Sequence, residues 1–505
     1  MRRGVGKYLL GIDLGTSACK AALFDREGKV LGAASANYNV YYPHAGWAEQ
    51  NPNEWWEGVC HAVKDVLMKT SASPEDIAGI GIDGQSWSAI AIDKSGNVLT
   101  NTPIWMDTRA KDICMRLNEQ IGEDAIFELS GNSLQPTYTT AKVIWYKENL
   151  PEVFEKTDKI LQSNGYLVYK LTGAVTQDIC QGYGWHCFDM RHGTWNYDMC
   201  RKLGIPESFL PPIVACDAVA GYVTKEAAAQ TGLAVGTPVV AGGLDAACGT
   251  LGAGVIHDGE TQEQGGQAGG MSICMESYKA DPRLILGYHV IPGKWLLQGG
   301  TVGGGGVMRW FEQEFADYER MLAKETGESS LNQLNALASK VAPGSDGLVF
   351  LPYMSGERSP IWNPEAKGVF YGLDFSKTKG HMVRACMEGV AYSLKHNLDV
   401  AKEAGASVTL LRAMGGSANS LLWTQIKADI TGIPIAVSSS DTATTLGAAI
   451  LAGVGTGYYA SYDEAVSLTV HETRRHEPDP DKKQAYDKNY EIYRKLYPAL
   501  EQLMK

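Results

Sequence analysis

The stretch YLLGIDLGTSACKAALFD, residues 8–25, decides the fold of this chain. An apolar run over 8–13 ends in Asp13, and a small polar turn at 15–17 (Gly-Thr-Ser) separates it from a second apolar run over 19–25. Apolar runs bounded by turn residues indicate buried strands. We therefore expect two antiparallel strands joined by a tight turn, with a carboxylate beside that turn.

The following residues extend this hairpin into a sheet. Residues 30–36 predict a third strand, and residues 53–69 place tryptophan, valine and leucine at helical spacing. Residues 77–82 predict a further strand after that helix. The order strand-strand-strand-helix-strand differs from the dinucleotide-binding Rossmann fold, in which a helix follows the first strand.

The second half of the chain repeats the opening pattern. Residues 259–276 read GETQEQGGQAGGMSICME, so a glycine-rich polar turn at 265–270 again adjoins an apolar strand. Because 505 residues exceed what one core accommodates, two related halves are the natural reading. We expect a boundary near 250–258 and divide the chain into domains 1–254 and 255–505.

Composition narrows the class of protein. A net charge of −12 and a pI of about 5.4 argue against nucleic acid or an anionic membrane as the partner, since both need a basic face. The apolar stretch 238–256 contains Asp245 and several glycines, which indicates a strand, a loop and a helix rather than a membrane span. Ten scattered cysteines without a C-x-x-C pair are typical of reduced core thiols in a cytoplasmic protein.

The first turn has the chemistry of an anion site. Glycine lets the backbone approach an anion closely, and Thr16, Ser17 and Lys20 could add donors to phosphate. Asp13 could then orient a hydrated Mg²⁺ beside a nucleotide. A tight hairpin with a local hydrogen bond from Asp13 is the alternative, and the pattern is not a P-loop because G-x-x-x-x-G-K-[ST] is absent from the sequence.

Asp245, in AGGLDAACG (residues 241–249), is a candidate general base. It follows an apolar strand and two glycines and precedes a small-residue segment that can begin a helix. A carboxylate there could cap the helix or accept a proton from a substrate hydroxyl, as phosphoryl transfer requires. The two roles are compatible.

Four segments in order resemble the marker segments of the FGGY carbohydrate kinases. They are GIDLGTSACK (11–20), AGGLDAACGTLGAG (241–254), FLPYMSGERSPIWNPEAKGVFYGL (350–373) and MGGSANSLLWTQIKADITGIPI (414–435). The resemblance covers most of the chain, and GWAEQNPNEWW (46–56) and WMDTRA (105–110) are similar to the xylulose-kinase-like branch.

The resemblance implies an α/β, actin/hexokinase-like ATPase fold of two ribonuclease-H-like domains. A sugar would bind the first domain, and ATP would lie across the interdomain cleft. Asp245 matches the catalytic base and Asp13 the carboxylate that positions Mg²⁺; both could meet the metal through water. The implied nucleotide residues are Thr16, Ser17, Lys20, Gly266, Gln267, Gly305, Gly306, Gly415, Gly416, Ser417 and Ser420.

The expected sugar pocket contains Gln85, Ser86, Trp87, Asp107, Arg109 and Asp245. Asp107 and Arg109 could bind sugar hydroxyls or form an ion pair with each other. Close relatives of D-xylulose kinase carry Met-His where this chain has Ser86-Trp87, and a hydroxyl residue where it has Gln267. The Ser86-Trp87 departure leaves the identity of the sugar open, and the Gln267 departure leaves the kinetics with ATP open.

The resulting prediction is an ATP-dependent kinase for a terminal hydroxyl of a ketose, with D-xylulose as first candidate. Ribulose, erythritol-type polyols and gluconate are alternative substrates; glycerol is disfavoured because the Arg-Glu of glycerol kinases is missing. A non-catalytic sugar- or nucleotide-binding regulator and an actin- or chaperone-like ATPase are alternatives outside the sugar kinases. Homodimers are common in the family, so a homodimer is one expectation.

Overall fold

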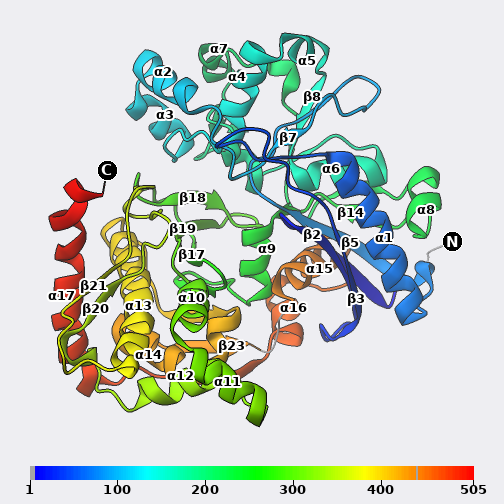
Figure 1. The fold of residues 1–505 in the computed structure, drawn as a ribbon. Coiled ribbons are helices and arrows are strands. Elements are labelled where there is room, and N and C mark those ends of the chain that lie inside the picture. The colour runs from blue at the N-terminus through cyan, green and yellow to red at the C-terminus, as the bar shows by residue number, and fades with distance from the viewer. Residues whose placement is uncertain (1–5, 439–441, 505) are drawn as a thin grey trace.

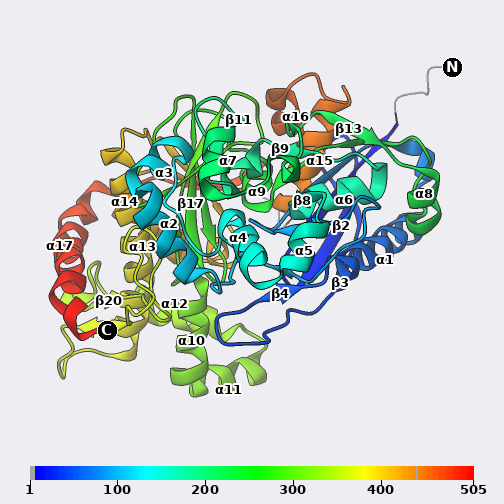
Figure 2. The ribbon, with the colours of Figure 1, turned by 90° about the horizontal axis from the view of Figure 1, so that it is seen from above.

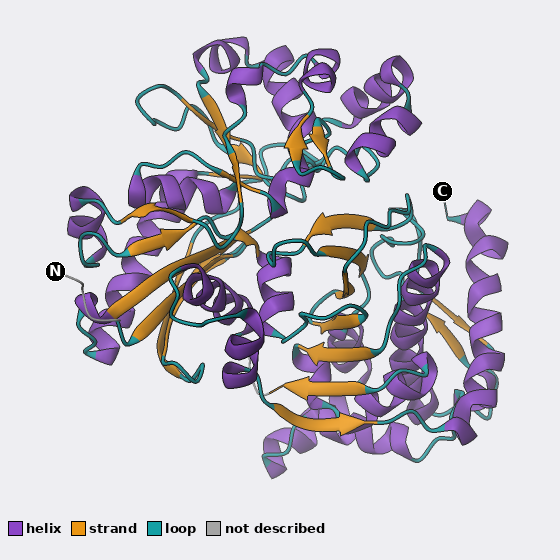
Figure 3. Cartoon of the chain, turned by 180° about the vertical axis from the view of Figure 1, so that it is seen from behind, coloured by secondary structure: helices purple, strands orange, loops and turns teal. Residues whose placement is uncertain are grey.

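The computed structural model describes residues 6–438 and 442–504. Two seven-stranded mixed sheets form the centres of two α/β halves (Figure 1; Figure 3). The first sheet has the order β13-β14-β5-β1-β2-β3, with β15 also paired to β5. Its strands are β1 (Tyr8–Leu14), β2 (Ala18–Phe24), β3 (Val30–Asn37), β5 (Ile77–Gly84), β13 (Val219–Tyr222), β14 (Pro238–Val240) and β15 (Gly243–Leu244).

The second sheet has the order β18-β19-β17-β16-β22-β23-β24. Its strands are β16 (Glu260–Gly265), β17 (Gly269–Met275), β18 (Ile285–Tyr288), β19 (Trp295–Thr301), β22 (Leu410–Met414), β23 (Ile435–Ser438) and β24 (Glu472–His476). Neighbouring strands pair in the same way across each sheet, from β3 to β13 in the first and from β19 to β24 in the second. In both sheets the first two pairs are antiparallel, the next two are parallel and the last is antiparallel. The two glycine turns are therefore equivalent hairpin turns of two related halves.

Helices cover the sheets as their apolar patterns dictate. Helix α1 (Pro52–Thr70) begins at the cap Asn51, whose side chain accepts from the Asn53 amide, and packs on β2 and β3 through its buried tryptophan and valine side chains. In the second half, α13 (Lys379–Glu403) and α14 (Leu421–Thr431) pack together beside the sheet, and α17 (Lys483–Leu500) lies at the outer end (Figure 2). The expected α/β class and strand order are confirmed.

One helix from late in the sequence packs on the first sheet. Helix α15 (Ala443–Gly455) lies against β1 and β5 and beside α9 (Asp245–Gly252), between the two halves (Figure 1). Glycines make this packing possible: a Cβ on Gly11 would lie 2.0 Å from the Thr445 carbonyl oxygen, and one on Gly81 would lie 1.8 Å from that of Ala448. The predicted boundary between 254 and 255 stays a prediction.

Residues 238–256 form two short strands and α9, as the glycines and Asp245 indicated. In the described part of the chain, no helix is both long and apolar enough to cross a membrane. The ten cysteines are all free, and nine of them are buried.

Candidate active site

Two carboxylates meet at the carboxyl ends of the central strands. Strand register places Asp13 of β1 beside Asp83 of β5. Both lie on the sheet face that α15 covers two residues earlier in each strand, at Gly11 and Gly81. Asp13 accepts a hydrogen bond from Thr444 Oγ1 at 3.0 Å, and Lys20 Nζ lies 3.8 Å from Asp13 Oδ2. The N-terminal turn of α15 and the second strand of the hairpin thus both supply donors to Asp13.

Asp83 was missed in the sequence. Its side chain is fully buried, no N–H or hydroxyl of the described residues donates to its carboxyl oxygens, and the protonated carboxyl can donate to Asp13. Burial, reinforced by the charges of Asp13 and Asp245, holds the pKa of Asp83 well above its usual range. A signal was present: Gly-Ile-Asp ends the apolar run at 11–13 and again at 81–83, so the tripeptide marks both neighbouring strands.

Replacing Asp83 by Asn should stabilise the protein at high pH. Because the folded-state pKa of Asp83 is raised, wild type loses stability as the pH rises above about 4, where the unfolded carboxyl ionises. The variant lacks this loss, so its melting temperature should exceed that of wild type at pH 8 and converge with it near pH 4. Thermal melts across this range test the expectation.

Asp178→Asn is the matched control for that comparison. Asp178 is equally buried, but its carboxylate accepts from the Gln181 amide at 2.8 Å and from Asn164 Nδ2 at 3.0 Å. This substitution should destabilise, because asparagine has one acceptor oxygen for these two donors, and its NH₂ group would face one of them. A lower melting temperature for both variants at pH 8 would contradict the interpretation of Asp83.

Asp245 opens α9 directly after β15. Its Oδ1 accepts from the Ala246 amide at 2.6 Å, but Asp245 is the first residue of the helix, the N-cap position is Leu244, and among the described residues no side chain caps α9. Burial and the charge of Asp13 raise the pKa of Asp245 to about 7. A carboxylate with that pKa can accept a proton near neutral pH, so the side chain is suited to general-base chemistry, whereas the expected helix cap is not formed.

The first turn is supported from outside the hairpin. The Thr16 carbonyl oxygen accepts from Gln50 Nε2 at 2.8 Å, and Thr16 Oγ1 accepts from Trp105 Nε1 at 2.9 Å. Ser17 and Lys20 are exposed next to the fixed turn. The turn is therefore held in place while exposed donors beside it remain available to an anion.

The second turn packs against the start of another helix. Helix α10 (Gly305–Phe315) begins on the β16–β17 hairpin, where the Gly305 amide donates to the Gly266 carbonyl at 2.7 Å and the Gly306 amide to that of Gln267 at 3.0 Å. A Cβ on Gly306 would lie 2.3 Å from Gln267 Nε2. Glycine is thus required where the long Gln267 side chain fills space over the helix terminus.

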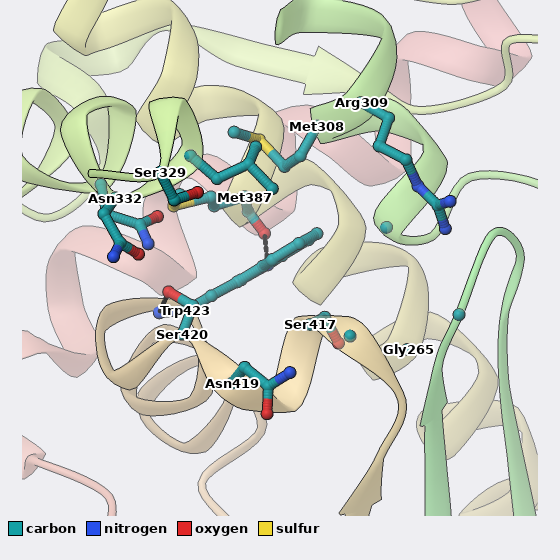
Figure 4. A pocket seen from close by; sticks show the side chains of 15 residues that line it. Gly265, Met308, Arg309, Ser329, Asn332, Met387, Ser417, Asn419, Ser420 and Trp423 are labelled. Atoms are coloured by element: carbon teal, nitrogen blue, oxygen red, sulfur yellow. Dashed lines mark hydrogen bonds between the residues drawn. The ribbon is translucent and has the colours of Figure 1, made fainter. Parts of the chain in front are cut away.

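A cavity of about 500 Å³ lies between the helices α10, α12 (Ser330–Ser339), α13 and α14 and the adjoining loops (Figure 4). Trp423 forms a flat wall, with Met308 and Met387 above it and polar groups at its rim (Figure 4). A second cavity of about 290 Å³ adjoins it and reaches Thr444, the partner of Asp13. The residues common to both cavities are Gly266, Gly416 and Asn419.

Several predicted nucleotide residues line these cavities. They are Gly266, Gly305, Gly415, Gly416, Ser417 and Ser420. Ser420 caps α14 by accepting from the Trp423 amide at 3.2 Å. Ser417 Oγ accepts from the buried Lys427, whose Nζ also donates to Glu263 Oε1 at 2.6 Å. Trp423 and Asn419 are lining residues that the sequence analysis did not single out.

The predicted sugar residues lie on the first half. Gln85 is buried directly after β5, and Trp87 adopts a left-handed φ of +57°. The Trp87 ring stacks on Tyr138 with centroids 4.2 Å apart, and its carbonyl oxygen accepts from the buried Lys142 at 2.8 Å. Burial lowers the pKa of Lys142 to about 7. Ser86 is half-buried beside them.

Asp107 and Arg109 form a buried ion pair. Arg109 donates to Asp107 through Nε and a terminal nitrogen, and that nitrogen also donates to Glu49 Oε2 at 2.7 Å. Asp107 further accepts from the Ala48 amide at 2.7 Å, and the guanidinium lies 3.8 Å from the centre of the Trp47 ring. Asp107 and Arg109 therefore form the expected ion pair with each other. Their contact with the sugar stays a prediction.

The comparisons with known proteins agree with this architecture. A family model described as "FGGY family of carbohydrate kinases, N-terminal domain" matches residues 8–252, and the corresponding C-terminal domain model matches residues 273–456. The chain belongs to the FGGY family of carbohydrate kinases. It is therefore a phosphotransferase that acts on a sugar hydroxyl with ATP as the phosphate donor, which decides against the regulator and the chaperone-like ATPase.

Relatives of this FGGY kinase include proteins named xylulose kinase and gluconokinase. It is 31% identical to a xylulose kinase of Bacillus subtilis (strain 168), over 97% of each chain, and 32% identical to a gluconokinase of the same strain, over 98% of this chain and 96% of the relative. The crystal structure of xylulose kinase from Rhodospirillum rubrum, 31% identical, matches with a TM-score of 0.89 over 99% of this chain and 100% of the other.

Proposed function

We propose that this kinase transfers the γ-phosphate of ATP to a terminal hydroxyl of a ketose, with D-xylulose as first candidate. The observation that carries the proposal is Asp245, a carboxyl with a pKa of about 7 at the start of α9, close enough to Asp13 for their charges to interact. Relatives named xylulose kinase support the sugar, and relatives named gluconokinase make a sugar acid the second candidate.

Charge favours the neutral ketose over the sugar acid. A charged donor such as arginine or lysine binds a carboxylate more strongly than a neutral donor does. Among the described residues, Lys142 donates to the Trp87 carbonyl and has a lowered pKa, and Arg109 is paired with Asp107 and Glu49. The stacked rings of Trp87 and Tyr138 instead offer an apolar surface to the C–H groups of a sugar.

The steps follow from the residues of the two halves. Gln85 and its neighbours orient the sugar, the two turns and the Trp423 cavity bind ATP, and Asp245 accepts the proton of the attacking hydroxyl. Backbone N–H groups of the turns stabilise charge on the phosphoryl oxygens. In this scheme residues 1–254 supply the sugar site and the first turn, and residues 255–505 the nucleotide site.

Mg²⁺ fits the site on charge grounds. Asp13 and Asp245 repel each other when both are ionised, and Asp83 adds a buried carboxyl beside Asp13, so a cation at this place would be favourable. Within the described residues, no three acidic, cysteine or histidine side chains could hold a metal by themselves. Asp13, and Asp245 through water, would hold Mg²⁺ together with the phosphates, and the ion would neutralise their charge.

A substrate panel tests the proposal. ADP release from ATP-Mg is measured with D-xylulose, D-ribulose, D-gluconate, erythritol and glycerol. The expected result is the largest kcat/KM with D-xylulose. Preference for gluconate would overturn the substrate and keep the mechanism, and an absence of stimulation by every compound would overturn the proposed activity.

The rate should rise with pH through about 7. Only ionised Asp245 accepts a proton, and its raised pKa keeps it protonated below neutral pH. The expected kcat/KM for the sugar therefore falls about tenfold for each pH unit below about 6. A profile from pH 5.5 to 9 at saturating ATP-Mg measures it, and a flat profile down to pH 5.5 would contradict this role.

A further inference from the structure

Gln50 is a fully buried side chain to which none of the expected roles was assigned. It lies in the short strand β4 (Glu49–Gln50), which pairs with β7 (Thr102–Pro103). Its Nε2 donates to the carbonyl oxygens of Thr16 at 2.8 Å and Asn39 at 3.0 Å, and its Oε1 accepts from Gln85 Nε2 at 2.8 Å. One amide thus joins the expected sugar residue to the phosphate turn.

These partners determine the orientation of both amides. Backbone carbonyls can only accept, so the nitrogen of Gln50 must face Thr16 and Asn39, and its oxygen must face Gln85. Gln85 must then donate to Gln50 through one N–H of Nε2, which leaves its Oε1 as the remaining acceptor. That oxygen is buried and has no partner among the described residues. A buried acceptor without a donor is unfavourable, which points to a donor that arrives with a ligand.

The backbone of Gln85 is fixed as firmly as its side chain. Its amide donates to the Leu14 carbonyl at 3.0 Å, and its carbonyl accepts from Ser163 Oγ at 2.7 Å. Rotation of the main chain would break the hydrogen bonds to Leu14 and Ser163. Rotation of the side-chain amide would break the hydrogen bond to Gln50. The residue presents one acceptor in one direction.

We propose that Gln50 is a positioning residue that makes Gln85 a hydrogen-bond acceptor toward the sugar and ties it to the turn at Thr16. The inference rests on the proposed function, because it takes the ligand at Gln85 to be the sugar. The sugar group that matches this free oxygen is a hydroxyl that donates. Gln50 also couples the sugar site to the nucleotide site through a single side chain.

A double-mutant cycle tests the positioning role. Gln50→Met keeps the side-chain size and removes the amide, and Gln85→Ala removes the acceptor. Each single variant should raise the sugar KM about tenfold, and the double variant should be no worse than Gln85→Ala alone, because Gln50 acts through Gln85. Multiplication of the two effects would overturn the proposal.

Gln177→Met is the matched control. Gln177 is also buried and donates through Nε2 to a backbone carbonyl, that of Asp178, at 2.9 Å. Loss of this amide should lower the melting temperature and leave the sugar KM within about twofold of wild type. A similar KM increase in this control would show that Gln50→Met acts through general destabilisation, and would overturn the positioning role.

Sugar analogues test the direction of the hydrogen bond. The informative position on the sugar is the hydroxyl whose removal raises KM for the wild-type enzyme but not for Gln85→Ala. There, a fluoro analogue, which cannot donate, should be as poor as the deoxy analogue. A fluoro analogue with the wild-type KM would show that Gln85 donates, and the proposed orientation would be wrong.

ADP binding without sugar separates this inference from the proposed function. Gln50→Met releases the Thr16 carbonyl and should weaken ADP binding about threefold, whereas Gln177→Met should not. If no sugar in the panel is phosphorylated, the proposed function fails while this measurement still decides whether Gln50 holds the turn. Unchanged ADP affinity in Gln50→Met would overturn the coupling of the two sites.

Discussion

Asp245→Asn is expected to lower kcat by about 10³-fold while the affinity for the sugar changes little. Asn keeps the shape of the side chain, and its oxygen can still accept from the Ala246 amide, as Asp245 does. It cannot accept the proton of the attacking hydroxyl. Steady-state rates with the preferred sugar, together with calorimetric titration of that sugar, measure the two quantities separately.

Two outcomes would contradict this assignment. A near-wild-type rate would show that another group accepts the proton, and Asp83 would then be the next carboxylate to consider. Loss of sugar binding together with turnover would instead show that Asp245 acts in binding. The melting temperature of the variant should remain at or above that of wild type at pH 8, because the substitution removes a partly buried charge that Asp13 repels.

Gly81→Ala is expected to have the largest effect on stability. The added methyl would lie 1.8 Å from the Ala448 carbonyl oxygen and 2.5 Å from its carbonyl carbon, and both atoms belong to the backbone of α15. Backbone in a packed helix cannot move as a flexible side chain does, so α15 must shift away from β5. We expect a loss of about 3 kcal/mol or more, seen as a lower melting temperature or as insoluble protein.

Gly287→Ala provides the control for a strand glycine. Its Cβ would make ordinary contacts of 3.5 Å or more, to Tyr183 and Gln298. This variant should remain within about 1 kcal/mol of wild type. If both variants melted alike, the close approach of α15 to β5 would not be the source of the effect.

The elements of the fold followed from local pattern. Apolar runs bounded by turns predicted β1, β2, β3 and β5 to within about two residues at each end. Helical spacing predicted α1, and the glycines around Asp245 predicted the strand, loop and helix that span 238–256. These features depend on neighbours in the sequence, which a single chain displays directly.

The parts that were missed depend on distant residues. Asp83 looked like an ordinary strand end until the register placed it beside Asp13. Gln50 belongs to the site because it bonds to Gln85, 35 residues away in the sequence. Thr444 belongs to it because it bonds to Asp13, 431 residues away. Asp107 and Arg109 left two alternatives open, because only their contacts with Trp47, Ala48 and Glu49 show how completely they pair. Long-range contacts decide the chemistry of a site, and local spacing does not display them.

Helix α15 also limits which fragments of the chain can fold alone or be exchanged between relatives. The sheet that carries Asp13 and Asp83 is completed by residues 443–455, so a fragment that ends at 254 would lack the helix that covers Gly11 and Gly81. Such a fragment would expose an apolar groove shaped for a helix it does not encode. A chimaera that takes its sugar specificity from one relative and its nucleotide site from another therefore has to exchange 443–455 together with the first 254 residues.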